Sequence, residues 1–270
     1  MTGDVAAAAA GSGGCHLFSG CGFPAPGLQN FNFKPLFTVG SFNFTKPEML
    51  AILCAVVVIV FFWVAFANPK VIPGRMQSLG ELGVLFVRDQ ILRPSIGSRG
   101  DKYLGLLISL FFYIFLCNIM ELIPVLQFPV MSRISFVFPM AIAVYVLYLY
   151  IGFRNQGGWG YVSNMWPRGV PWPVYIILIP VELLRFFIIQ PFTLGIRLFA
   201  NMFAGHLLLS IFMVATWYLA GLTIGLLFAV GSAVMVLFVF LLELLIDILQ
   251  AFIFTTLTAT YIAASIEAQH

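Results

Sequence analysis

The chain has 270 residues, of which 61% are hydrophobic and only 9% are charged. Soluble domains carry about 25% charged residues, so this composition excludes an ordinary soluble domain and indicates an integral membrane protein. The 13 Lys and Arg residues are too few and too dispersed to form a phosphate-binding patch, which argues against a nucleic-acid partner. No P-loop motif is present, so we expect no nucleotide site in this chain.

Residues 1–47 form an N-terminal segment that begins with low-complexity sequence. No Lys or Arg occurs in residues 1–33, so the cationic start of a secretory signal peptide is missing. Cys15 and Cys21 can form a disulfide if this end faces an oxidising compartment. Cys54 and Cys117 fall in apolar runs, where we expect them to act as small hydrophobic side chains. No CxxC pair occurs, and we expect no metal site.

Apolar runs of about 20 residues predict membrane-crossing helices. The first three runs lie at 48–67, 103–124 and 134–153. Two later stretches, 173–218 and 222–266, are apolar for roughly twice the length that crosses a bilayer. Each stretch is either two short membrane-crossing helices joined by a tight turn or one long, strongly tilted helix. Because no turn or charge signal marks either midpoint, we favour two long tilted helices that form a hairpin.

The segment between the first two spans predicts an amphipathic helix on the membrane surface, at about 75–93. Leu79, Leu82 and Phe86 recur there at helical spacing beside Arg88. Six Lys and Arg residues between positions 68 and 102 place this loop in the cytoplasm by the positive-inside rule. Alternating crossings then put the N-terminus outside and the C-terminus inside. Arg133 lies in an expected outside loop and disagrees with this orientation.

These patterns together predict an all-α integral membrane protein. We expect about five membrane-crossing helices and one amphipathic surface helix. Residues 1–47 would be an extracytoplasmic segment, and residues 48–270 would form a single membrane domain.

Ionisable side chains at membrane depth are functional-site candidates, because they are costly to place there. Arg197 is the most informative, since its guanidinium cannot lose its proton and no Lys or Arg follows it in the chain. At the bilayer centre an arginine costs about 2.5–3.5 kcal/mol on insertion scales. The other polar candidates are Asn118, Glu121, Glu182, Asn201, His206, Glu243, Asp247 and Gln250.

Helical spacing separates these candidates into different surfaces. Asn201 shares a face with Arg197, whereas His206 lies near the opposite face. Glu243 and Asp247 form a stripe with Gln250 on the last helix, and Asn118 shares a face with Glu121. Chains of carboxylate and imidazole groups conduct protons through membranes, whereas an arginine repels cations. The pattern predicts two aqueous half-paths for protons that a fixed cation keeps apart.

Structural roles are the alternative for several of these side chains. The alternatives are an ion pair between Glu182 and Arg185, interhelical hydrogen bonds from Asn201 and Gln250, a structural His206–Glu243 pair, and burial of Arg197 against Asp247.

Three motifs resemble the a subunit of F-type ATP synthases. They are Ile196–His206 (IRLFANMFAGH), Leu249–Phe254 (LQAFIF) with the following Leu257-Thr258 and Tyr261-Ile262, and Asn118–Pro124 (NIMELIP). The resemblance covers most of the chain from Pro24 onward. The segment from Cys15 to Pro26 looks like the actinobacterial version of this subunit.

The resemblance implies the stator half of a proton-driven motor in the plasma membrane. Its partners would be the ring of c subunits, b-type peripheral stalk subunits and the lipid bilayer, with no cofactor. Arg197 would face the ring and draw each passing c-subunit carboxylate into its ionised form. Protons would enter from outside past Asn118, Glu121, Asn201, His206, Glu243 and Gln250, and would leave near Glu182. The long hairpin would wrap the ring.

The chain departs from the family pattern at three places. Some members carry Glu where this chain has His206 and His where it has Glu243, so the pair is exchanged. Asp247 is not expected at its position, and we include it in the proton path. The spacing from Glu182 to Pro191 looks one residue longer than in other members.

A stand-alone proton-coupled transporter is the alternative function. Such transporters commonly contain internal repeats and discontinuous helices. The two halves of this sequence show no such repeat.

Overall fold

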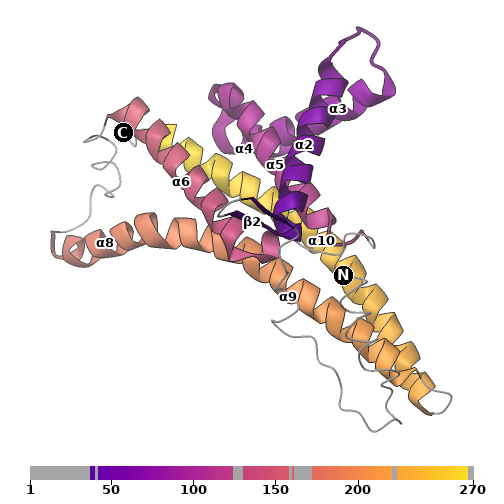
Figure 1. Cartoon of the computed structure of the whole chain (residues 1–270). Helices are drawn as coiled ribbons and strands as arrows, with labels where there is room; N and C mark the ends of the chain where they lie inside the picture. Colours follow the sequence, from indigo (N-terminus) through magenta and orange to yellow (C-terminus); the bar gives the residue numbers. More distant parts are fainter. Residues whose placement is uncertain are drawn as a thin grey trace. The chain divides into compact units, whose positions relative to one another are not determined.

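The computed structural model describes residues 37–39, 42–123, 130–157, 160, 172–220 and 224–266 (Figure 1). Within these residues the regular structure is helical, apart from the paired three-residue strands β1 (Phe37–Val39) and β2 (Phe42–Phe44). Five helical segments are long and apolar enough to cross a membrane. The predicted all-α membrane fold is therefore confirmed. The expected Cys15–Cys21 pair lies outside the described residues.

The first long helix, α2 (Lys46–Phe66), begins at a polar cap. The backbone N–H of Thr45 donates a hydrogen bond to Glu48 Oε2 at 2.7 Å, while the N–H groups of the first turn bond back to the Thr45 carbonyl. These bonds satisfy groups that a helix start leaves unpaired. No charged residue follows Glu48 in this helix. Its large apolar side chains, such as Trp63 at 72% exposed, therefore need lipid or a partner to cover them.

The second segment is a helical path with one sharp break. It runs through α3 (Arg75–Val87), a π-turn (Arg88–Leu92) and α4 (Arg93–Ile96), and then a 3₁₀ turn (Gly97–Tyr103) leads into α5 (Leu104–Ile119). Gly97 has φ of 72°, a conformation that glycine adopts without strain. Arg93 and Asp101 form an ion pair of 3.3 Å across this break.

Helix α3 packs closely on the end of α2. A Cβ atom placed on Gly80 would lie 2.9 Å from the Cβ of Ala65, so only glycine permits this approach. At the far end of the segment, α5 stops at Ile119, five residues before the expected end at 124. Pro124 gives a reason, because a proline disfavours helical backbone at the residue before it.

The third segment, α6 (Ile134–Gln156), buries one face along its length. Val137, Ala141, Val144 and Tyr148 recur on that face every three or four residues, as helical geometry requires. The helix ends at Gly157, which has φ of 75°.

Each of the last two segments is one long helical path. The sequence analysis favoured this arrangement over two short membrane spans in each segment. One runs through α8 (Trp172–Leu184), a π-turn (Arg185–Ile189) and α9 (Gln190–Leu219). The other is α10 (Ile224–Ile266). The π-turn falls within the interval from Glu182 to Pro191, where one extra residue was expected. A π-turn absorbs a single inserted residue without ending the helix.

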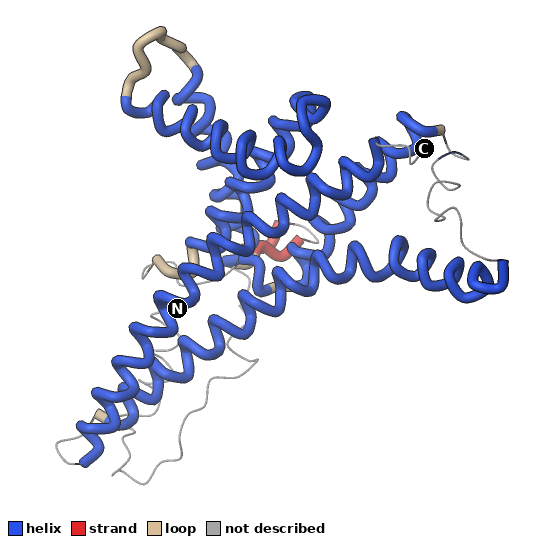
Figure 2. Tube along the Cα trace, turned by 180° about the vertical axis from the view of Figure 1, so that it is seen from behind, coloured by secondary structure: helices blue, strands red, loops and turns tan. Residues whose placement is uncertain are grey.

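The chain divides into two compact units. The first comprises residues 1–56, 115–132 and 200–249, and the second comprises residues 57–114, 133–199 and 250–270. Within the first unit α9 and α10 lie side by side as an antiparallel hairpin, which both views show (Figures 1 and 2). Thr216 Oγ1 donates to Ser232 Oγ at 3.0 Å near the connection between them.

Candidate functional site

Five polar side chains meet inside the first unit. Three elements supply them: α5 with the turn that follows it, α9, and α10. Their exposed fractions are all 7% or less, and the residues are Asn118, Glu121, His206, Glu243 and Asp247. The sequence predicted each of them as a site residue but could not show that they gather at one place.

The shortest polar contact in this cluster joins His206 and Glu121. His206 Nδ1 lies 2.8 Å from Glu121 Oε1. When Glu121 is ionised, the imidazole N–H donates to it, and when Glu121 carries the proton, the ring nitrogen accepts. The pair can therefore pass a proton in either direction. The sequence suggested Glu243 as the partner of His206, whereas the direct hydrogen bond is to Glu121.

Glu243 lies beside this pair. Its carboxyl group is within hydrogen-bonding reach of Glu121 and interacts electrostatically with His206. Two carboxylates offer only acceptors, so their contact becomes a hydrogen bond only when a proton lies between them. Asp247 is fully buried one turn further along α10 and interacts electrostatically with both Glu121 and Glu243. Three carboxyl groups therefore lie close enough to influence one another electrostatically.

Two neighbours hold this arrangement in place. Asn118 Nδ2 donates to the backbone carbonyl of Asp247 at 3.4 Å, which ties α5 to α10. Gly205, next to His206 on α9, leaves the space that the Glu243 side chain occupies. A Cβ atom on Gly205 would overlap Glu243 Oε1 and would lie 3.1 Å from its Cδ. Sequence reasoning missed Gly205, although it stands inside the first family-like motif.

Arg185, Arg197 and Glu182 lie in the second unit. Arg197 is half-buried on α9, and among the described residues it takes part in no ion pair. Asn201, one turn later on α9, is exposed, and Gln250 on α10 is buried. The suggested ion pair between Arg185 and Glu182 is present, with Arg185 the more exposed partner.

Three further polar residues of the second unit were missed by sequence reasoning. Tyr148 on α6 donates to Gln190 Oε1 at 3.3 Å, and its ring lies 5.5 Å from the ring of Tyr261 on α10. Tyr261 is in turn close enough to interact electrostatically with Arg185 and Arg197. The sequence signal for these residues was weak. Tyrosine is common in apolar helices, and its position in the sequence does not show which partner its hydroxyl group will meet.

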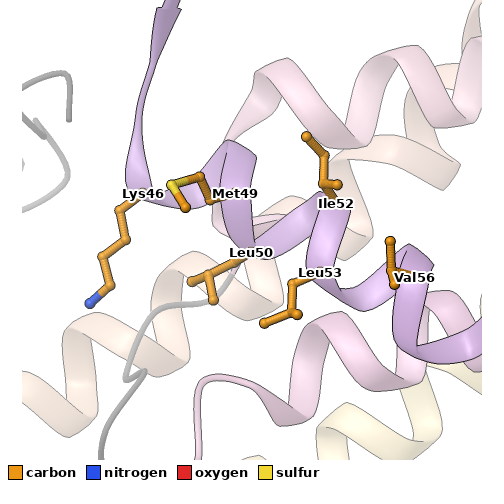
Figure 3. Close-up of a pocket in the computed structure, with 6 residues that line it drawn as sticks. All are labelled: Lys46, Met49, Leu50, Ile52, Leu53 and Val56. Carbon is orange, nitrogen blue, oxygen red and sulfur yellow. The ribbon is translucent and has the colours of Figure 1, made fainter. Parts of the chain in front are cut away.

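A hollow of about 410 Å³ lies along α2, and Figure 3 shows its lining. Successive turns of α2 supply five apolar side chains, and Lys46 is the only charged one. Sites for small molecules combine apolar walls with several convergent polar groups. This hollow has only one such group, so it is not a second candidate site. No group of three or more His, Cys, Asp or Glu side chains in the described chain could hold a metal ion.

The chain has close relatives among known proteins. The family profile described as ATP synthase A chain matches residues 49–263. An ATP synthase subunit a of Streptomyces lividans is 41% identical over 95% of this chain and 92% of its own length. The subunit a of Frankia alni is 38% identical over 90% of this chain and 86% of its own length. The subunit a of Rhodococcus erythropolis is 35% identical over 91% of this chain and 91% of its own length. The chain therefore belongs to the ATP synthase A chain family.

Proposed function

We propose that this chain is the proton-conducting stator subunit in the membrane sector of a rotary ATP synthase. Membership of the ATP synthase A chain family supports an Fo-sector subunit that translocates protons. One structural observation carries the mechanism. The groups that can exchange protons are buried together around the 2.8 Å contact of His206 with Glu121, whereas Arg197 is half-buried and free of ion pairs within the described chain.

The buried cluster forms the uptake path. A proton from the outer aqueous side reaches the Glu243, Asp247 and Glu121 carboxyl groups, which can hand it on because they are neighbours. Glu121 gives it to His206 Nδ1 across their hydrogen bond. Asn201 and Gln250 offer amide groups that orient water or the rotor carboxylate at the end of this path. Asn118 positions Asp247 through its backbone.

Arg197 separates uptake from release. Its guanidinium holds a permanent positive charge and cannot relay a proton. At about 4 Å, and with an effective dielectric constant near 20, it would stabilise an ionised rotor carboxylate by about 4 kcal/mol. The carboxylate therefore releases its proton on the way past Arg197. The released proton leaves near Glu182, where the paired Arg185 keeps the carboxylate in place.

This function requires partners that cover the exposed apolar faces. A ring of c subunits would lie against the side that carries Arg197, and b-type stalk subunits would hold the chain still against rotation. The subunit would span the plasma membrane several times, with its N-terminus outside and its C-terminus in the cytoplasm.

The test is the Arg197→Ala variant in inverted membrane vesicles. We expect ATP-driven proton pumping to be abolished while the complex still assembles, because the fixed charge is lost without removing a buried contact. Arg154→Ala is the matched control, since Arg154 lies exposed near the end of α6 and should leave pumping unchanged. Normal pumping by Arg197→Ala would overturn the mechanism.

Copurification separates this function from a stand-alone transporter. A stator subunit should purify with a small, multi-copy membrane protein that bears a membrane carboxylate. Recovery of the chain alone, or only as a homo-oligomer with proton transport activity, would support the transporter instead.

A further inference from the structure

We infer that Glu121, Glu243 and Asp247, together with Asn118, form a buried proton-storage site, which holds water and more than one proton ahead of His206. This inference rests on the proposed function. It assigns to the cluster a ligand, the hydrated proton, and it gives Asp247 a role that the family pattern does not provide.

The first argument is that the cluster lacks donors. Buried oxygen atoms without a hydrogen-bond partner in the described chain are Asn118 Oδ1, Glu121 Oε2, both carboxylate oxygens of Glu243 and both of Asp247. All of them are acceptors, and buried acceptors are almost always satisfied in native proteins. Among the described contacts, His206 Nδ1 meets Glu121 Oε1 and Asn118 Nδ2 donates to the Asp247 carbonyl, and no described donor reaches the remaining oxygens. Water and added protons are donors that would satisfy them.

The second argument is charge. α10 contributes two carboxyl groups, the turn after α5 contributes a third, and α9 contributes one imidazole. No Lys or Arg pairs with any of them among the described residues. Like charges in contact and away from water cannot all stay ionised, so the group keeps protons rather than counter-ions.

The positions of the carboxyl groups suggest how the protons are divided. Glu121 and Glu243 are within hydrogen-bonding reach and share one proton, as two adjacent carboxyl groups do in aspartic proteases. Asp247 interacts electrostatically with both and holds a second proton. When His206 gives its proton to the rotor, Glu121 supplies the next one. Asp247 then refills the Glu121–Glu243 pair, and outer water returns one proton to Asp247, so no charge accumulates.

The experiment is infrared difference spectroscopy of the intact complex in vesicles, which reports the C=O stretch of protonated carboxylic acids. Subtracting the Asp247→Asn spectrum from that of the unchanged protein should leave the absorption of one protonated carboxyl group that shifts in D₂O. Asp247→Glu should restore it at a different frequency. Asp89→Asn is the matched control, because Asp89 is exposed and outside the cluster, and its difference spectrum should lack this absorption.

A second variant keeps the test independent of Asp247. Glu243→Gln should remove the absorption of the shared proton while the Asp247 absorption remains. The storage site is wrong if neither variant changes the protonated-carboxyl region. It is also wrong if sodium added at constant pH removes the absorption while potassium does not, because the cluster would then bind a metal cation.

These outcomes can be told apart from failure of the proposed function. If Arg197→Ala abolishes pumping but the spectra show no stored proton, the stator function stands and only the storage site fails. If Arg197→Ala pumps normally, the stator mechanism fails whatever the spectra show.

Discussion

The hydrogen bond between His206 and Glu121 joins two side chains that are 85 residues apart in the chain. It pairs an imidazole with a carboxyl group, and the two side chains are 7% and 2% exposed. At this position a proton can move between the two side chains without any movement of the backbone. The pair is therefore the step of the uptake path with the clearest geometry.

Exchange of these two residues tests whether they act as a pair. We expect Glu121→His and His206→Glu each to reduce ATP-driven proton pumping by at least about tenfold, because each puts two like groups together. The double exchange should recover a large part of the activity, since the same hydrogen bond is rebuilt in reverse. Pumping in inverted vesicles measures all three variants. Equal losses in all of them would show that the two side chains do not act together.

The hairpin of α9 and α10 brings the cluster together because it is closely packed at one point. Gly205 lets the Glu243 carboxyl group lie against α9, where any larger side chain would meet it. The π-helical turn in the segment α8–α9 acts differently, since a turn of this kind can accommodate an inserted residue without ending the helix. Both features position functional groups without carrying any chemistry.

A methyl group at Gly205 tests the close packing of the hairpin. Gly205→Ala should strongly reduce passive proton conduction, because the Glu243 carboxyl group must move away from its neighbours. Gly231→Ala is the matched control, since a Cβ atom at Gly231 on α10 meets nothing within 4 Å. An exposed Gly→Ala change inside a helix should even stabilise it by about 1 kcal/mol. Proton flux through stripped vesicles measures both variants, and equal conduction would contradict the role of Gly205.

Across the whole molecule, the long helices expose many large apolar side chains. Examples are Leu227 at 74%, Ile177 at 71% and Ile59 at 67%. Patches of this kind mark surfaces that lipid or partner subunits cover. The chain is thus built to be one part of a membrane assembly. The charged loop between the first two long helices gives the expected direction of insertion.

Cysteine labelling tests that direction. Ser98→Cys, in the exposed 3₁₀ turn, should react with a membrane-impermeant maleimide in inverted vesicles and be protected in right-side-out vesicles. Ala220→Cys, next to the α9–α10 connection, should show the opposite pattern. The fully buried Cys54 and Cys117 should contribute little, and Cys15 and Cys21 are replaced by Ser. Reaction of Ser98→Cys only in right-side-out vesicles would reverse the proposed orientation.

The sequence alone determined the membrane class, the five long helices and which polar residues fall within the apolar runs. These features are local, because an apolar run of sufficient length predicts a crossing helix wherever it packs, and a charged residue within such a run is conspicuous. The motif around Arg197 added the family. Helical spacing placed Arg197 and His206 on different faces of one helix, and Arg197 is half-buried whereas His206 is buried.

Only the tertiary structure decided which polar groups meet. Spacing along one helix gives the face on which a side chain lies, but not which other helix covers that face or at what height. For this reason His206 bonds to Glu121 although Glu243 was the suggested partner, and Asp247 lies near the Glu243 and Glu121 carboxyl groups. The sequence analysis missed Gly205 and Tyr148 for the same reason. A close approach or a hydrogen bond between two helices depends on how they pack, and packing leaves no periodic pattern in the sequence.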